Sequence, residues 1–267
     1  MASGRERTEA VVPLVIAHLS DLHLGAHDPA AVASVVEDVA AAGPALTVVT
    51  GDLTMRARTG QFRQAAALVD RLPAPRLVVL GNHDVPLISV ERVLSPYRRY
   101  RGLVRADLDP VLRLPGVTAL GLNSMPRWRW KSGRVSRRQS ETVAAVLGSA
   151  PPGAVRLLAL HHPASSAGPA RIAGGRRLLR AVADARVDLI LAGHTHLPAA
   201  GPIGPSGTAH RPVEVVAGTA VSRRTRGGIG RSWTMIRVDA AAVVVVERRQ
   251  AAAGWRTADV RRFPRHG

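Results

Sequence analysis

Residues 187–198 read VDLILAGHTHLP and join an apolar run of strand length to a turn that holds two histidines. The run 187–192 has the pattern of a fully buried strand, and the Gly-His-Thr-His turn follows it directly. Two histidines this close together fit either half of a metal site or an ordinary polar loop. The remainder of the chain distinguishes these interpretations, because it repeats the arrangement of an apolar run followed by a polar cluster.

Apolar runs of strand length recur along the first two thirds of the chain, and five of them end in polar clusters. The runs lie at residues 11–17, 45–50, 76–80, 117–122, 155–160 and 187–192. The segments between them, such as 29–43 and 59–72, carry apolar residues three and four positions apart, which is the helical period. This alternation predicts an α/β fold with largely buried strands.

The last third of the chain has a different pattern. Residues 213–218, 231–239 and 241–249 are apolar runs separated by short turns rich in glycine and arginine. We expect them to be antiparallel strands of a second sheet. We also expect one domain over residues 1–267, with a core over about residues 12–250, flexible N- and C-terminal ends and a frayed RRFPRHG terminus.

The composition excludes several kinds of site. The chain has 267 residues and no cysteine, so disulfides, zinc knuckles and cysteine nucleophiles are ruled out. Any metal must then be held by His, Asp, Glu or Asn. The longest apolar run, residues 240–246, is far too short to span a bilayer. We therefore expect a soluble, cytoplasmic protein without a membrane span.

The formal charge of +18 comes almost entirely from arginine, since Lys131 is the only lysine. A GC-rich coding sequence would produce this bias without any partner; the alternative is a positive field that attracts phosphate-bearing molecules. Residues 127–131, RWRWK, interleave aromatic and basic side chains and could stack a nucleobase, or form a surface loop. Residues 218–232 carry several arginines and either line the rim of a site or form a solvated hairpin.

The polar clusters at the strand ends contain a set of side chains able to bind metals. Open α/β sheets bind ligands at the carboxyl ends of their strands, so these clusters should face one another. Neutral imidazole and carboxylate oxygen suit zinc, manganese and iron, and two ions need roughly four to six donors each. The candidates are Asp21, His23, Asp52, Asn82, His83, His161, His162, His194 and His196.

Five motifs in a fixed order resemble the calcineurin-like metallophosphoesterases: DLH, GDL, GNHD, HHP and GHTH, within about residues 14–220. HLSDLHLG, GNHDVP and LHHP are similar to the bacterial cyclic-nucleotide phosphodiesterase-like branch of that family. The resemblance implies a four-layer αββα sandwich of two mixed β-sheets flanked by helices. It also implies a centre of two divalent metal ions, which we expect to be manganese, iron or zinc.

Carried over by position, the resemblance implies that the first ion is held by Asp21, His23 and His196. It implies that the second ion is held by Asn82, His161 and His194. The carboxylate of Asp52 would bridge the two ions. An Asp-x-His or His-x-His pair at an extended strand end points both side chains to one face. Gly51, Gly81 and Gly193 would let the chain turn tightly as it leaves each strand.

Further roles follow for the neighbours of these ligands. His83 resembles the family's general acid, which protonates the leaving alkoxide; the alternatives are an eighth ligand or a loop histidine. We expect Asp84 to orient a neighbouring histidine. The family pattern selects His161 rather than His162 as the ligand, whereas spacing alone leaves both open.

The function that these features predict is a dinuclear metal-dependent phosphoesterase. It would hydrolyse a small phosphodiester or phosphomonoester, such as a cyclic nucleotide, by a metal-bridged hydroxide. A metal-dependent nuclease acting on DNA or RNA is the first alternative, supported by the charge and by RWRWK, although nucleic acid is the less favoured partner. A non-catalytic interaction scaffold is the second, but it predicts eroded ligands, and none is missing.

Overall fold

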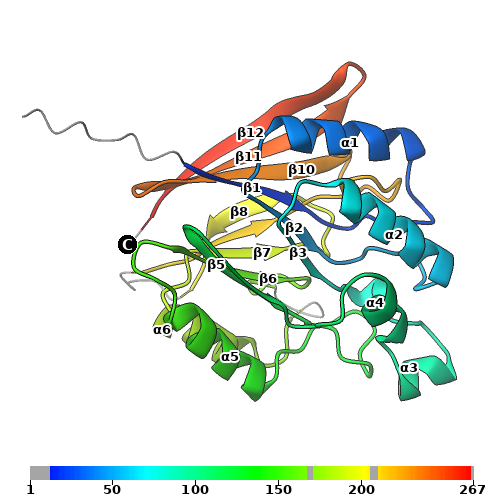
Figure 1. The fold of residues 1–267 in the computed structure, drawn as a ribbon, viewed down its shortest axis with the longest axis horizontal. Coiled ribbons are helices and arrows are strands. Elements are labelled where there is room, and N and C mark those ends of the chain that lie inside the picture. Colours follow the sequence, from blue (N-terminus) through cyan, green and yellow to red (C-terminus); the bar gives the residue numbers. More distant parts are fainter. Residues whose placement is uncertain (1–12, 167–170, 205–209, 266–267) are drawn as a thin grey trace, which may run out of the picture.

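The computed structural model describes residues 13–166, 171–204 and 210–265. Two six-stranded mixed sheets pack face to face, with helices covering their outer faces, as Figure 1 shows. This arrangement confirms the predicted αββα sandwich. Among the described residues, no helix combines the length and the apolar character needed to cross a membrane.

The first sheet has the order β12-β11-β10-β1-β2-β3. Its parallel half is β1 (Leu14–Leu19), β2 (Leu46–Thr50) and β3 (Arg76–Val79), which match three of the predicted runs. Its antiparallel half is β10 (Ser232–Val238), β11 (Ala242–Ala251) and β12 (Gly254–Pro264).

The second sheet has the order β4-β5-β6-β7-β9-β8. Its four central strands are parallel: β5 (Val117–Leu122), β6 (Val155–Leu160), β7 (Leu189–Ala192) and β9 (Val213–Val216). Antiparallel strands close its edges: β4 (Val111–Leu114) and β8 (Ala199–Pro202).

Two of the longer helices pack on the outer face of each sheet. The first sheet carries α1 (Pro29–Ala41) and α2 (Thr59–Arg71), and the second carries α5 (Arg137–Gly148) and α6 (Gly175–Asp184). Three short segments connect β3 to β4: η1 (Asn82–Asp84), α3 (Val90–Leu94) and α4 (Arg98–Leu103). The side chain of Asp28 caps α1, and that of Ser136 caps α5, so both helices begin where the sequence supplies an acceptor.

Three apolar layers hold the four structural layers together. Between the sheets, Ile16 and Val48 belong to the same buried cluster as Leu157 and Leu189. The outer layers bury the apolar stripes of the helices, for example Phe62 of α2 against the first sheet. Removing this apolar surface from water is the main force that stacks the layers.

The structure corrects two expectations for the last third of the chain. The runs 231–239 and 241–249 do not build a second sheet, because β10 pairs antiparallel with the free edge of β1 and extends the first sheet. Residues 213–218 join the second sheet as β9, parallel to β7. The buried Trp233 ring stabilises the placement of β10, and its Nε1 donates to the Asp38 carboxylate of α1 at 2.8 Å.

The last strand extends beyond the expected end of the core near residue 250, which corrects the expectation of a frayed terminus. β12 continues to Pro264 and pairs with β11 along its length, so residues 261–264 are not frayed. This pairing gives partners to the main-chain groups of the last strand that face β11. The N-terminal residues 1–12, for which we expect flexibility, and residues 266–267 lie outside the described residues.

Candidate metal centre

The candidate ligands leave their strands in an unusual backbone conformation. In the described chain, five of the seven non-glycine residues with positive φ are candidate ligands: Asp21 (51°), His23 (47°), Asp52 (49°), His194 (71°) and His196 (60°). The prediction that Asp-x-His and His-x-His lie on extended strand ends is therefore wrong. Residues other than glycine rarely adopt this left-handed backbone conformation, because it brings their side chain against the main chain. Such strained conformations concentrate at functional sites.

Two glycines allow the strand ends to approach one another closely. Gly51 has φ +89°, and a Cβ placed there would lie 2.6 Å from the Gly81 nitrogen. A Cβ on Gly193 would lie 1.8 Å from Ser20 Oγ. Only glycine fits either position, and this brings the β2, β3 and β7 ends together with that of β1.

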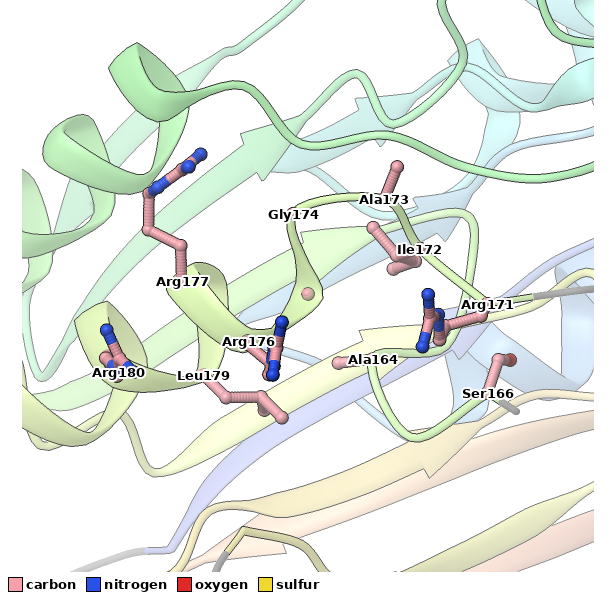
Figure 2. A pocket seen from close by; sticks show the side chains of 11 residues that line it. Ala164, Ser166, Arg171, Ile172, Ala173, Gly174, Arg176, Arg177, Leu179 and Arg180 are labelled. Carbon is pink, nitrogen blue, oxygen red and sulfur yellow. The ribbon is translucent and has the colours of Figure 1, made fainter. Parts of the chain in front are cut away.

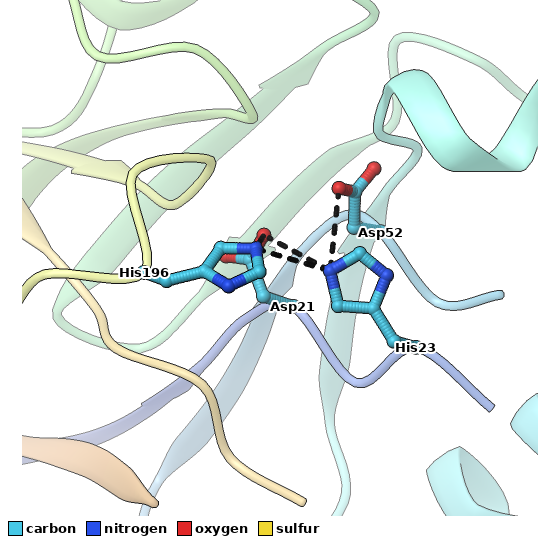
Figure 3. A group of neighbouring side chains, drawn as sticks. All are labelled: Asp21, His23, Asp52 and His196. Atoms are coloured by element: carbon cyan, nitrogen blue, oxygen red, sulfur yellow. Dashed lines mark hydrogen bonds and ion pairs between the residues drawn. The ribbon is translucent and has the colours of Figure 1, made fainter. Parts of the chain in front are cut away.

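The first group of donors is Asp21, His23 and His196, and it forms one cluster with Asp52. Figure 3 shows that the four side chains point toward one another. Their ligand atoms all lie within 4.8 Å of one another, and all four residues are buried. His23 Nε2 is 3.1 Å from His196 Nε2, and His196 Nε2 is 3.2 Å from Asp21 Oδ1. The structure thus brings the predicted first-ion group into one cluster.

A second group of donors lies beside the first. Asn82 Oδ1 is 3.1 Å from His161 Nε2 and 3.0 Å from His194 Nδ1, and these two nitrogens are 3.3 Å apart. Strand β3 leads to Asn82, β6 to His161 and β7 to His194. The predicted second-ion group is therefore also assembled.

Asp52 stands between the two groups. Its Oδ2 lies 3.6 Å from His23 Nε2 in the first group, and its Oδ1 lies 3.4 Å from His161 Nε2 in the second. The main-chain N–H of His83 donates to Oδ1 at 2.8 Å and fixes the carboxylate in this orientation. One carboxylate thus presents one oxygen to each group.

Burial keeps the imidazoles neutral, which is the form that binds a metal. It lowers the pKa of His23 to about 2 and that of His161 to about 3, and it also lowers the pKa of His194. Burial, followed by the nearby Asp21 carboxylate, raises the pKa of Asp52 well above its usual range. A bound cation would favour the ionised carboxylate, so metal binding would release a proton.

The donor set fits a cation because its nitrogen and oxygen atoms converge without being consumed by other bonds. Asp21 Oδ1 faces the cluster, is buried and makes no hydrogen bond with any described residue. His161 Nδ1 donates to the Thr50 carbonyl at 2.8 Å, and His196 Nδ1 donates to the Arg224 carbonyl at 2.6 Å. Each of these bonds leaves the Nε2 lone pair directed into the cluster, as in metal-binding histidines.

His83 lies at the edge of the two groups. Its Nδ1 donates to the Met55 carbonyl at 2.9 Å, so Nε2 is the nitrogen that faces the open side. Burial lowers the pKa of His83, the bond to Met55 opposes this effect, and the Arg224 guanidinium adds to it. A half-buried imidazole beside the donors has the position that a general acid requires.

Asp84 does not orient a histidine, contrary to expectation. Its carboxylate accepts hydrogen bonds from the main-chain N–H groups of Leu53 (3.0 Å), Thr54 (2.8 Å) and Gly81 (2.9 Å). Asp84 therefore ties the turn after β2 to the turn after β3. The reason is geometric, since the turns after β2 and β3 direct these three main-chain donors at its carboxylate.

His162 makes contacts that occupy both of its nitrogens. Nδ1 lies 2.8 Å from Ser124 Oγ, and Nε2 donates to the Lys131 carbonyl at 2.8 Å. His161, by contrast, directs Nε2 toward Asn82 and Asp52. This geometry supports the choice of His161 that the family pattern made.

Arg224 is the functional-site residue that the sequence did not single out. Its guanidinium Nη1 is 3.4 Å from His83 Nε2, and its carbonyl anchors His196. Residues 218–232 thus reach the rim of the site, which is one of the two roles considered for them. The available signal was an arginine-rich segment following β9, but nothing in it distinguishes Arg224 from its neighbours.

Two cavities differ in what they offer. A cavity of about 260 Å³ opens beside the donors and is lined by Asn82, His83 and Arg224, together with Trp130 and Lys131. A larger cavity of about 620 Å³ lies between the start of α6 and the loop after β6, as Figure 2 shows. Among the described residues that line it there are four arginines but no carboxylate or imidazole. The smaller cavity is therefore the one that adjoins the candidate donors.

Sequence comparison identifies a family and a relative. The model of the family named calcineurin-like phosphoesterase matches residues 14–198. The chain is also 28% identical over 200 residues to a probable cyclic nucleotide phosphodiesterase from Synechococcus sp.. That match covers 68% of this chain and 73% of the relative. The resemblance expected from the five motifs is confirmed.

Solved structures share the fold. A purple acid phosphatase from yellow lupin seeds superposes with a TM-score of 0.74 at 13% identity, covering 95% of this chain and 54% of the lupin chain. The chain thus spans about half the length of that protein. Vacuolar Protein Sorting 29 from Cryptosporidium parvum gives a TM-score of 0.50 at 11% identity, with 95% and 100% coverage. At such identities the likeness shows the fold alone.

The family match spans more than half of the chain and includes both groups of donors. It begins at the first residue of β1 and ends two residues after His196, so every motif that supplies a candidate ligand lies inside it. The chain belongs to the calcineurin-like phosphoesterase family.

Proposed function

We propose that the chain is a phosphoesterase that works with two divalent cations. Asp52 carries the proposal, because its two oxygens face two separate groups of donors. Manganese, iron and zinc all suit this combination of imidazole, carboxylate and amide. The proposed ligands are, for the first ion, Asp21, His23 and His196; for the second, Asn82, His161 and His194; and for both, Asp52.

The proposed reaction is the hydrolysis of a phosphate ester. When bound, two such ions supply a water of lowered pKa and positive charge for the phosphoryl oxygens. The water loses one proton to solvent, its oxygen bonds to phosphorus, and the bond from phosphorus to the alcohol oxygen breaks. Because Nδ1 of His83 carries the proton that bonds to the Met55 carbonyl, Nε2 first takes up a proton from solvent. Nε2 then gives this proton to the departing alcohol oxygen, so no alkoxide is released.

Arg224 prepares the open side of the site for an anion. Its guanidinium lies at the rim, 3.4 Å from the nitrogen that would face the leaving group. A guanidinium binds phosphoryl oxygens through paired N–H donors, and these bonds are stronger than those between neutral groups. We assign it the binding of the substrate phosphate.

A small phosphodiester is the substrate class that we favour. The cavity beside His83 has a volume of about 260 Å³, which suits one small molecule. The Synechococcus relative is named a probable cyclic nucleotide phosphodiesterase, and a cyclic nucleotide is a phosphodiester of this size. A phosphomonoester has the same phosphoryl group and remains in the proposed range.

A non-catalytic scaffold is the competing proposal. One neighbour of the same fold is named for vacuolar protein sorting rather than for hydrolysis. Against this role, the chain retains every donor, in strained backbone conformations that an interaction surface would not need.

The proposal is tested with protein stripped of metal by a chelator and reloaded with manganese, iron or zinc. Hydrolysis of bis(p-nitrophenyl) phosphate, p-nitrophenyl phosphate, cyclic AMP and single-stranded DNA is then compared. We expect turnover of a small ester that chelation abolishes and one of the metals restores. Turnover that is indifferent to chelation, or absent with every metal and substrate, would overturn the proposal.

A further inference from the structure

We propose that Trp130 forms a binding subsite for the aromatic base of a nucleotide substrate. The inference rests on the proposed function, because it assigns the organic part of the same phosphate ester. Trp130 lines the cavity that also contains Asn82 and His83. A base stacked on its ring would leave the attached phosphate in the same small cavity, beside Asn82 and His83.

Trp130 is exposed although the chain around it is firmly held. Its side chain is 49% exposed. On one side of it, Arg92 donates to the Arg129 carbonyl at 2.5 Å; on the other, His162 donates to the Lys131 carbonyl at 2.8 Å. Exposing a large apolar ring on an anchored loop costs free energy, which a ligand covering that ring would recover.

Arg92 links this loop to the segment that bears His83. It is buried, and its guanidinium lies 4.6 Å from the centre of the Trp130 ring, in a cation–π contact. The same guanidinium donates to the Pro86 carbonyl at 2.6 Å, three residues after His83. Arg92 is therefore a positioning residue that keeps the ring beside the catalytic edge.

The remaining walls of the cavity indicate the charge of the ligand. Leu87 and Val85 add apolar surface, while Arg56, Lys131 and Arg224 add positive charge. No carboxylate is found among the described residues that line it. An aromatic group attached to a phosphate matches this combination of apolar and cationic walls.

The size of the cavity favours a single nucleotide over a strand. A volume of about 260 Å³ lies just below the roughly 300 Å³ at which small-molecule sites begin. Polynucleotide grooves instead present several successive aromatic platforms along a basic track. Trp128 is 66% exposed but does not line the cavity, so it provides a matched control.

The test compares two probes that differ only by the base. AMP and ribose 5-phosphate are titrated calorimetrically into the metal-loaded protein and into Trp130→Ala, Trp130→Phe and Trp128→Ala. We expect the wild type to prefer AMP, and Trp130→Ala to lose about 5- to 150-fold in AMP affinity, which corresponds to about 1–3 kcal/mol of stacking. Ribose 5-phosphate should bind all four proteins alike, Trp130→Phe should keep most of the AMP preference, and Trp128→Ala all of it.

Equal binding of the two probes to the wild type would overturn the subsite, as would equal losses in the two tryptophan-to-alanine variants. Salt-resistant binding of single-stranded DNA that Trp130→Ala abolishes, without a preference for AMP, would replace the base subsite by a polynucleotide track. Because these titrations measure binding, they fail independently of turnover. Metal-dependent hydrolysis of a p-nitrophenyl ester by the same protein would show that the proposed function stands when the subsite does not.

Discussion

The metal-donor groups and the Trp130 wall of the cavity meet at one edge of the molecule but are built differently. The donors follow buried strands, and Asp21, His23 and His161 are fully buried. Trp130 lies on a loop and is half exposed. Strand ends locked by two packed sheets fix positions closely, as hydrolytic chemistry requires. Loops tolerate change, so we expect the donors to determine the reaction and the wall to determine the substrate.

The largest expected effect comes from the residue shared by both groups. Asp52→Ala removes a carboxylate that faces each group and leaves two cations less well screened from one another. We expect metal content to fall and activity to drop by more than the roughly 10- to 100-fold typical of an outer partner of a ligand. Elemental analysis measures the metal content, and ester hydrolysis measures the activity.

A surface aspartate provides the control for this change. Asp70→Ala alters a side chain that is 77% exposed. This change should leave the metal content and the hydrolytic activity unchanged. If Asp52→Ala keeps its full metal content and activity, the donors do not determine the reaction.

The second effect separates proton transfer from metal binding. His83→Ala removes the imidazole at the edge of the donors, so the ions should remain while turnover slows by about 10²- to 10⁴-fold. The loss should be smallest for esters with good leaving groups, which need no proton. A series of aryl phosphodiesters whose alcohols differ in pKa measures how the loss of turnover depends on the leaving group. Equal losses across the series would exclude His83 as the acid.

The third effect concerns the rim, between the donors and the wall. Arg224→Met removes a guanidinium next to His83 and should raise the KM for a small diester about 10- to 100-fold, because hydrogen bonds to charged groups contribute about 1.5–3 kcal/mol. Metal content should not change. Arg223→Met removes an equal charge from an exposed neighbour and should have little effect. Equal effects of the two changes would mean that only net charge matters.

The smallest effect is expected for polynucleotide binding. If the +18 charge is only a compositional bias, single-stranded DNA should bind weakly, and its affinity should fall steeply with salt. Trp128→Ala should then change it little. Fluorescence anisotropy at several salt concentrations measures how the affinity for single-stranded DNA falls with salt. Salt-resistant binding together with cleavage of the strand would favour the nuclease instead.

The donors could be predicted from the sequence because each follows an apolar run. His161 comes directly after β6, and Asp21 follows β1 by two residues, so the direction of the parallel strands alone brings them to one edge. Packing of the two sheets then places the first group against the second. The division into two groups came from the family resemblance, and the distances around Asp52 agree with it.

Other features depend on contacts that no local pattern records. Arg224 is one arginine in a basic chain, and only tertiary packing places it beside His83. The partner of β10 is set by the free edge of β1, which the apolar pattern of residues 231–239 does not identify. The left-handed backbone at His194 likewise follows from sheet packing, since isolated histidine disfavours that conformation.

The most direct test of the central claim is the electron paramagnetic resonance spectrum of the protein loaded with manganese. Two ions held by groups that share Asp52 should lie about 3.5–4 Å apart, close enough for their spins to couple. We predict two manganese ions per chain and an exchange-coupled spectrum that Asp52→Ala abolishes. One ion per chain, or two ions whose spectra are independent of one another, would contradict it.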